Sequence, residues 1–281
     1  MRIDAHQHFW HYDAREYDWI DDRMQAIRRD FMPEELKPLL AGAGFDGSVA
    51  VQVRQSLEET RFLLDLADAN DFVRGVVGWV DLQSPEAGSQ LDAFRGRRKL
   101  VGVRHIVQSE PDERFLLRES FGRGLRTLEA RGLAYDLLLY PRHLKPAAEL
   151  VARFPGLRFV LDHAAKPAIA RREIADWARD LEALAAFPNV LCKLSGLVTE
   201  ADWTSWTAAD IRPYLDVLFG AFGAERLMIG SDWPVCTVAA DYGRATGLVL
   251  DYLARRPEAE EAAVCGGNAV RFWKLTREEK P

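Results

Sequence analysis

The chain has 281 residues, of which 48% are hydrophobic, so it is long enough to bury a sizeable core. Its formal net charge of -6 at pH 7 argues against a nucleic-acid-binding protein, which needs a clustered basic surface. No apolar run approaches the roughly 20 residues that cross a bilayer, no export signal opens the chain and the three cysteines are odd in number, so we expect a soluble, cytoplasmic protein without a membrane partner.

Short apolar runs alternate along the chain with longer segments of helical periodicity, which is the pattern of parallel strands joined by crossover helices. We count eight such runs, at residues 2–6, 47–53, 73–80, 100–107, 134–140, 158–163, 190–194 and 226–232. The helical pattern is clearest at residues 60–69, 147–154, 174–187 and 211–222. Ser56 and Glu59 form a capping-box signature before the first of these helices.

Eight units of about 35 residues each match a (β/α)8 TIM barrel of the α/β class, formed as a single domain over residues 1–281. An open doubly wound sheet is the alternative. It is disfavoured because no glycine-rich phosphate loop follows any run. In a barrel the carboxyl ends of the strands meet at one face, so polar residues at these ends are the candidates for a site.

Two histidines and an aspartate are the strongest candidates for a metal or catalytic site. His6 and His8 end the first run, and their spacing of two places both on one face of a strand. Asp232 ends the eighth run, and His163 ends the sixth and offers a third imidazole. Three nitrogens and one oxygen suit Zn²⁺. The alternatives are an ordinary surface histidine pair and a His163 that only binds loop backbone.

Asp232 has a second role open to it, because a carboxylate beside a metal can also accept a proton from the attacking water. We predict that this general-base role is its main one. An aspartate of modest pKa suffices, since a metal lowers the pKa of its bound water toward about 7.

Other polar residues near the strand ends are candidates for binding a substrate. Gln52 interrupts a valine-rich run, and Lys193 lies in a strand, where burial is costly unless the charge is paired. Arg104 and His105 are adjacent, so strand alternation sends only one of them into the barrel, and a structural salt bridge is an equal alternative for the arginine. Trp203 offers an aromatic face of the kind that stacks on sugars, although tryptophan also fills barrel rims.

Five segments spread over nearly the whole chain resemble one family. They are IDAHQHFW at residues 3–10, residues 51–60, VLDHAAKP at 160–167, KLSGLVTE at 193–200 and GSDWPV at 230–235. Together they resemble the amidohydrolase superfamily and, within it, the branch of sugar-acid lactonases. The resemblance implies a (β/α)8 barrel that hydrolyses an intramolecular ester at a site built from His6, His8, His163 and Asp232.

The resemblance also bears on the number of metal ions. Many superfamily members hold two metals bridged by a carboxylated lysine on the fourth strand, where this chain has Arg104 and His105. This departure favours one divalent metal ion, with zinc expected, or metal-independent catalysis, since some lactonases of the branch are thought to work without metal.

We therefore expect a cytoplasmic hydrolase that opens the 1,4- or 1,5-lactone of a sugar acid such as L-fuconate in sugar catabolism. A metal or the imidazoles would polarise the carbonyl, Asp232 would activate water, and Lys193 or Arg104 would steady the oxyanion. The alternatives are a metal-dependent decarboxylase of a small carboxylic acid and a non-catalytic barrel that binds sugar acids. The preferred lactone and the oligomeric state stay open at this point.

Overall fold

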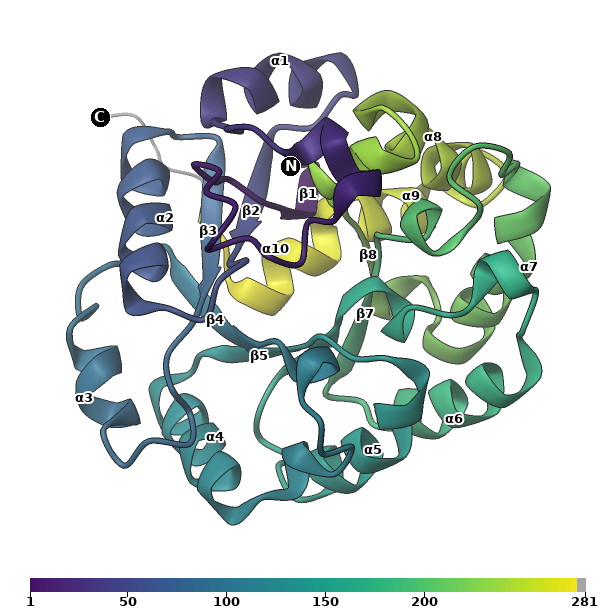
Figure 1. The fold of residues 1–281 in the computed structure, drawn as a ribbon. Coiled ribbons are helices and arrows are strands. Elements are labelled where there is room, and N and C mark those ends of the chain that lie inside the picture. Colours follow the sequence, from purple (N-terminus) through teal and green to yellow (C-terminus); the bar gives the residue numbers. More distant parts are fainter. Residues whose placement is uncertain (277–281) are drawn as a thin grey trace.

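The computed structural model describes residues 1–276, so residues 277–281 of the expected domain lie outside the described part. Eight parallel strands form one sheet in the order β1 to β8, and helices surround it (Figure 1). The strands are β1 (Ile3–Gln7), β2 (Gly47–Val51), β3 (Val73–Gly78), β4 (Leu100–His105), β5 (Ala134–Leu137), β6 (Phe159–Leu161), β7 (Val190–Leu194) and β8 (Leu227–Ile229). Each predicted run overlaps a strand, and the (β/α)8 barrel is confirmed.

The helices of the described residues lie outside the sheet and at one end of it. They are α1 (Pro33–Gly42), α2 (Leu57–Ala69), α3 (Ala87–Asp92), α4 (Glu119–Arg131), α5 (Leu144–Ala152), α6 (Ala175–Ala185), α7 (Ala208–Phe222), α8 (Tyr242–Leu253), α9 (Glu258–Ala262) and α10 (Asn268–Trp273). The predicted helices correspond to α2, α5, α6 and α7. Ser56 caps α2 as predicted, but the Glu59 carboxylate accepts from the amides of Val53 and Arg54 at 3.0 and 2.7 Å, so it ties the β2–α2 loop instead of completing the capping box.

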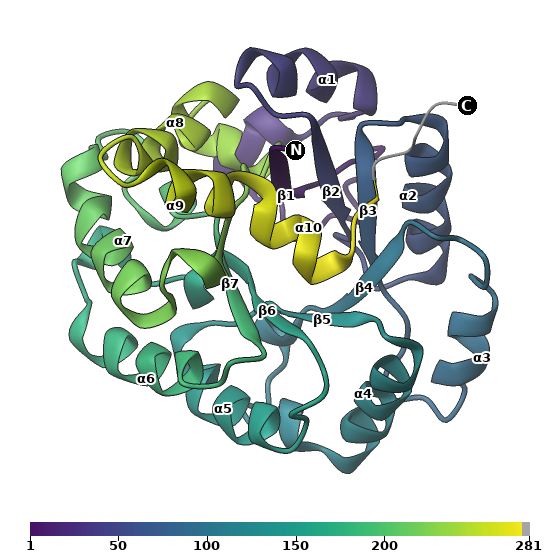
Figure 2. The same ribbon diagram turned by 180° about the vertical axis from the view of Figure 1, so that it is seen from behind.

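Apolar side chains fill the amino-terminal end of the barrel interior. They come from the strands and from α10, and include Ile3, Ala5, Val49, Val77, Val160, Met228 and Trp273. Figure 2 shows α10 lying across this end of the barrel. The carboxyl ends of the parallel strands therefore meet at the opposite end, where the β1–α1 loop lies in front of the barrel in Figure 1.

The barrel closes where β1 meets the segment that follows β8, which we call the seam. The amide of Asp232 donates to the carbonyl of His6 at 2.8 Å, and the amide of His8 donates to the carbonyl of Trp233 at 2.7 Å. A parallel bridge between Gln7 and Trp233 continues this pairing. Residues from the two ends of the chain are thus hydrogen-bonded to each other at the carboxyl edge of the barrel.

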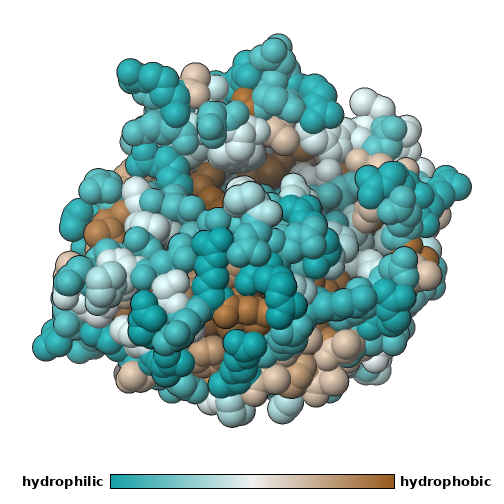
Figure 3. All heavy atoms as spheres, turned by 60° about the horizontal axis from the view of Figure 1, so that its bottom comes forward, coloured by the Kyte–Doolittle hydropathy of each residue, from teal (hydrophilic) through white to brown (hydrophobic). Residues whose placement is uncertain are grey.

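The outer surface is mainly hydrophilic on the face that Figure 3 shows, with small apolar areas between charged side chains. Among residues 1–276, the large hydrophobic side chains that stand out into solvent are Trp19 and Leu39, at 39% and 36% exposure. Within the same range, none of the helices has the length and apolar character needed to span a membrane.

Candidate active site

A β-bulge in β1 turns His6 into the barrel. Between two positions paired with β2, β1 advances by three residues, from Asp4 to Gln7, while β2 advances by only two. The extra residue interrupts the alternation, so Ala5 packs in the apolar interior and the next side chain, His6, also faces inward. Bulges often re-aim a side chain beside an active site in this way.

Three imidazoles and one carboxylate meet at the carboxyl end of the barrel. His8 Nε2 lies 3.2 Å from Asp232 Oδ1, and the Nε2 atoms of His6 and His163 each lie 3.8 Å from the same oxygen. The Nε2 atoms of His6 and His8 are 3.2 Å apart. The structure thus brings together the four residues that the sequence predicts as ligands and catalytic groups, all of them buried.

The hydrogen bond of His8 indicates that this cluster is built for a cation. His8 Nδ1 lies 2.8 Å from the carbonyl oxygen of Val51, which can only accept, so Nδ1 carries the proton. In neutral His8 the Nε2 lone pair then faces the Asp232 carboxylate at 3.2 Å, and two acceptors so close repel unless a metal ion or a proton lies between them. Ligand atoms about 3.3 Å apart are what tetrahedral zinc requires, because its bonds to nitrogen are about 2.0–2.1 Å long. The ligand atoms of His6, His8 and Asp232 therefore fit a divalent metal.

Burial and neighbouring charges favour the forms of these groups that bind metals. Burial lowers the pKa of His6 well below its ordinary value, and the Lys193 ammonium lowers it further. Burial also lowers the pKa of His163 to about 4. Burial alone would raise the pKa of Asp232, but the imidazoles, His163 first, outweigh it and hold the pKa below its usual range. His6 and His163 are thus neutral and Asp232 is ionised at neutral pH.

A buried ion network lies on the Nδ1 side of His6. Lys193 Nζ lies 2.5 Å from Asp136 Oδ2, 2.8 Å from Asp162 Oδ1 and 3.2 Å from His6 Nδ1, and 5.2 Å from the centre of the Trp273 ring. Burial raises the pKa of Asp136 to about 7, although the Lys193 ammonium lowers it. The negative charge of Asp162 adds to the rise. Burial would also raise the pKa of Asp162, but Lys193 leads the charges that hold it well below its ordinary value.

Arg104 is the second cation beside His6. Its Nη1 donates to Asp162 Oδ2 at 2.9 Å and lies 3.3 Å from His6 Nε2. Its Nη2 donates to the side-chain and backbone oxygens of Gln52, so the predicted substrate residue Gln52 holds the guanidinium in place. A register shift between β3 and β4 accompanies the inward position of Arg104.

His105 and Trp203 occupy other places than the cluster. His105 stacks on Phe115 at 4.7 Å and its Nε2 lies 2.7 Å from Glu110 Oε1, on the outer side of β4. Alternation along β4 sends His105 outward once Arg104 faces inward, so the structure places it away from the cluster, and a contact of His105 with substrate stays a prediction. Trp203 lies in the β7–α7 loop, where its indole N–H donates to the carbonyl of Thr199 at 2.8 Å.

Asp4 is a functional support that the sequence analysis missed. Its carboxylate accepts from the amide and hydroxyl of Ser231 at 2.8 and 2.6 Å and from the hydroxyl of Tyr242 at 3.0 Å. Burial raises its pKa to about 6, against these hydrogen bonds. Asp4 thus ties β1 to the residue before Asp232. The sequence feature that could have identified Asp4 is its position as a charged residue between the apolar residues Ile3 and Ala5 in the first run.

Two glycines pack directly against histidines of the cluster. A Cβ on Gly196 would lie 2.5 Å from His163 Nδ1, and a Cβ on Gly230 would lie 2.7 Å from His6 Cβ. Gly196 also has a φ of +64°, which side-chain-bearing residues rarely adopt. Glycine after a strand end is the sequence signal for such a close approach.

Gly196→Ala is expected to lower turnover at least tenfold, because the new methyl group must displace the His163 ring, and misplaced catalytic groups cost about 10²-fold in rate. Gly132→Ala is the matched control, since Gly132 has a similar φ of +67° but open space where the methyl group would lie. Gly132→Ala should lose about 1–2 kcal/mol of unfolding free energy in urea through its positive φ alone, and Gly196→Ala should lose more because of the clash. Equal turnover in the two variants would contradict the close-approach argument.

Two hollows adjoin this end of the barrel. One, of about 710 Å³, is lined by Tyr140, Lys166, Glu200 and residues of α6. Burial raises the pKa of Glu200, with Lys166 opposing and Asp232 adding to the rise, so this hollow lies within electrostatic reach of the cluster. The other, of about 380 Å³, lies against Trp233.

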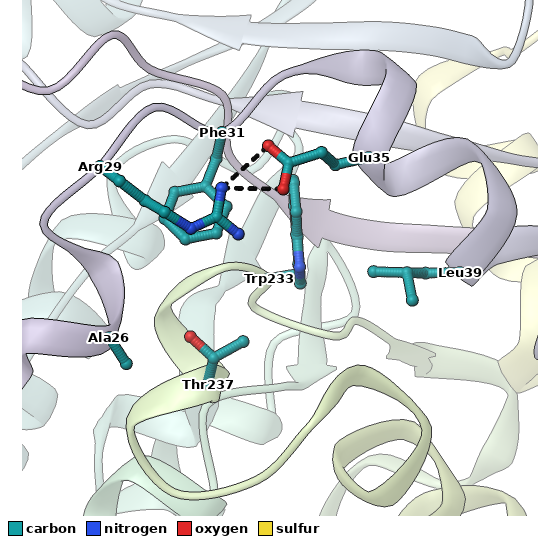
Figure 4. Close-up of a pocket in the computed structure, with 7 residues that line it drawn as sticks. All are labelled: Ala26, Arg29, Phe31, Glu35, Leu39, Trp233 and Thr237. Atoms are coloured by element: carbon teal, nitrogen blue, oxygen red, sulfur yellow. Dashed lines mark hydrogen bonds and ion pairs between the residues drawn. The ribbon is translucent and has the colours of Figure 1, made fainter.

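The hollow against Trp233 has its own internal pairing. Figure 4 shows Arg29 and Glu35 paired at its rim, at 2.8 Å, with the Arg29 guanidinium 3.8 Å from the centre of the Phe31 ring. Its charged groups are thus neutralised locally, and Trp233 rather than Asp232 forms its wall. The hollow beside Glu200 is the one whose charges act on the cluster.

The fold is a (β/α)8 barrel, and histidines at the ends of β1 and β6 meet an aspartate that follows β8 at its carboxyl end. The amidohydrolase family matches residues 3–275, and the chain belongs to this family. The predicted resemblance is thereby confirmed.

Relatives match along almost the whole chain. The L-fucono-1,5-lactonase of Burkholderia multivorans is 43% identical, with 98% of this chain and 96% of the relative covered. The L-fucono-1,5-lactonase of Burkholderia ambifaria is 41% identical, with 99% and 97% covered. A crystal structure of an amidohydrolase from Burkholderia multivorans with bound zinc has a TM-score of 0.95 at 43% identity and covers 98% of this chain and 100% of that one.

Proposed function

We propose that this protein hydrolyses a sugar-acid lactone, an L-fuconolactone or a related 1,4- or 1,5-aldonolactone, to the free acid. The observation that carries the proposal is the meeting of an ionised Asp232 with three imidazoles at the seam. Relatives named L-fucono-1,5-lactonase at 41–43% identity support it and favour it over the decarboxylase and the non-catalytic barrel.

One divalent metal ion, for which zinc is the best fit, would be held by His6, His8, His163 and Asp232. When bound, it would supply polarisation of the lactone carbonyl and a lower pKa for attacking water. Lys193 Nζ lies 3.2 Å from His6 Nδ1, the nitrogen on the far side from His8, and its positive charge opposes a second divalent ion there. We therefore propose a single metal site.

Asp232 acts as the general base. Its backbone is fixed by the bond to the His6 carbonyl and adopts a φ of +58°, a conformation that costs about 1 kcal/mol or more and persists only where the surroundings enforce it. The carboxylate accepts the proton of the water that attacks the lactone carbonyl carbon. When the bond to the ring oxygen breaks, Asp232 returns this proton to the departing alkoxide.

The two cations divide the remaining work. Arg104 lies beside His6 Nε2 and is oriented by Gln52, so its guanidinium is placed to stabilise the negative charge that develops on the carbonyl oxygen. Lys193 is held between two carboxylates and acts through His6 rather than on the substrate. The hydroxyl groups of the lactone face the hollow of Lys166 and Glu200.

A panel of sugar-acid lactones, followed with a pH indicator, tests the proposal. Acid release above the protein-free rate is expected from L-fucono-1,5-lactone or a closely related ring, and the same assay after chelation measures the metal dependence. The protein-free blank is essential because such esters also open in water. Release of CO₂ from small carboxylic acids, with no acid release from any lactone, would refute the lactonase and favour the decarboxylase.

We also propose that the protein works in the cytoplasm, in sugar catabolism such as L-fucose degradation. The cysteines Cys192, Cys236 and Cys265 are all buried and free, which suits a reducing compartment.

A further inference from the structure

The Nδ1 atoms of His8 and His163 have different kinds of hydrogen-bond partner. His8 Nδ1 faces the Val51 carbonyl at 2.8 Å, and a carbonyl can only accept, so the tautomer of His8 is fixed. His163 Nδ1 lies 2.9 Å from the Ser195 hydroxyl, and a hydroxyl can rotate either to donate or to accept. His163 can therefore carry its proton on either nitrogen without losing this hydrogen bond.

His6 differs from both. Its Nδ1 lies 3.2 Å from the Lys193 ammonium, which only donates, and 3.4 Å from the Asp162 carboxylate, which only accepts. Either tautomer of His6 thus gains one partner and faces one unfavourable charge. Among the three imidazoles, His163 is the one whose partner adapts to both tautomers at no cost in charge.

The packing around His163 fixes its ring, so the main thing that can change is which ring nitrogen carries the proton. Ser195 directly follows β7 and is 3% exposed, and the next residue, Gly196, packs so closely that a Cβ there would lie 2.5 Å from His163 Nδ1. The ring is therefore held in place. Its Nε2 points toward Asp232 Oδ1 at 3.8 Å, in the centre of the cluster.

We propose that Ser195 is a positioning residue that lets His163 change tautomer. With the proton on Nδ1, Ser195 accepts and the Nε2 lone pair can bind a divalent metal. With the proton on Nε2, Ser195 donates and His163 offers an N–H to an oxygen acceptor such as the lactone carbonyl. The exchange with water breaks one N–H bond and forms another, so the charge is unchanged. This inference rests on the proposed lactonase function and explains how one site can work with or without metal.

Nitrogen NMR of histidine-labelled protein tests the tautomer directly. In chelated protein we expect the His163 proton on Nε2, because this nitrogen faces the Asp232 carboxylate, and after addition of zinc we expect it on Nδ1. The His163 signals are assigned by their loss in His163→Gln, and the Nδ1–H of His8, which keeps its carbonyl partner in both states, serves as the internal reference. An identical His163 tautomer in both states would overturn the proposal.

Ser195→Ala supplies the second test. Competition with a chromophoric chelator should show zinc affinity lowered about 10–100-fold, as for other groups that orient a ligand, because Nδ1–H loses its acceptor. Thr246→Ala is the control, since it removes a buried hydroxyl bond of 2.8 Å in α8 and should leave zinc affinity unchanged.

Two outcomes would overturn the proposal: unchanged zinc affinity in Ser195→Ala, or loss of all turnover when the wild-type protein is chelated. Failure of the proposed function looks different. In that case neither the zinc-loaded nor the chelated wild type opens any lactone, while the NMR and zinc-affinity measurements still decide the role of Ser195.

Discussion

Asp232→Asn is expected to lower kcat for lactone hydrolysis by about 10²–10⁴-fold, the range for removal of a general base. The amide keeps the size of the side chain but cannot accept a proton from water. KM should change by less than about threefold, because the loss falls on the chemical step. Steady-state kinetics with the best lactone of the panel, at fixed zinc concentration, measure both constants.

The control for this substitution is Asp241→Asn. Asp241 caps α8 by accepting from the Arg244 amide at 2.7 Å, and asparagine caps helices equally well. Its turnover should equal that of the wild type. If Asp232→Asn keeps more than about a tenth of wild-type kcat, another group is the base. Zinc affinity measured in parallel separates loss of the base from loss of the metal.

Lys193→Met is expected to lower the free energy of unfolding by about 3–5 kcal/mol, the usual cost of removing one partner of a buried ion network. The substitution leaves Asp136 and Asp162 in the barrel interior without the ammonium between them. Urea unfolding followed by circular dichroism measures the change. Lys145→Met is the surface control, because Lys145 is 71% exposed and its 3.8 Å contact with Asp180 should contribute less than about 1 kcal/mol.

A double-mutant cycle separates charge from packing at Lys193. Asp136→Asn added to Lys193→Met removes the carboxylate that the ammonium neutralised, whereas Asp162 keeps Arg104 at 2.9 Å. The double variant should regain about 1–3 kcal/mol relative to Lys193→Met alone, as coupled residues do. A double variant no more stable than the single one would mean that the loss comes from packing in the barrel.

The strands were predictable because apolar runs at regular spacing are a local property of the chain. The orientation of His6 and His8 was only partly predictable. The spacing of two placed His6 and His8 on one face, which the structure agrees with. Alternation counted from the buried Ile3 and Ala5, however, would turn both histidines outward, and the bulge that corrects this has no signature in the sequence.

Which of Arg104 and His105 faces the barrel interior was also not predictable, because an irregularity in strand pairing again decides it. Alternation stated that one of them faces the interior but not which one, because the register shift between β3 and β4 depends on the packing of neighbouring strands. The carboxylates Asp136 and Asp162 were passed over although each interrupts an apolar run. These two carboxylates are stabilised in the interior by Lys193, which approaches them only in the closed barrel, so their role could not be inferred from the sequence.

The seam also constrains how the protein is made. His8 and Asp232 are 224 residues apart, so the ribosome must release nearly the whole chain before the proposed metal-ligand set is complete. Until then β1 is an open sheet edge, whose unpaired backbone groups invite pairing with other chains. A product truncated before β8 would carry histidines without their carboxylate and remain prone to aggregation, so the step that finishes the catalytic centre is also the one that protects the nascent protein.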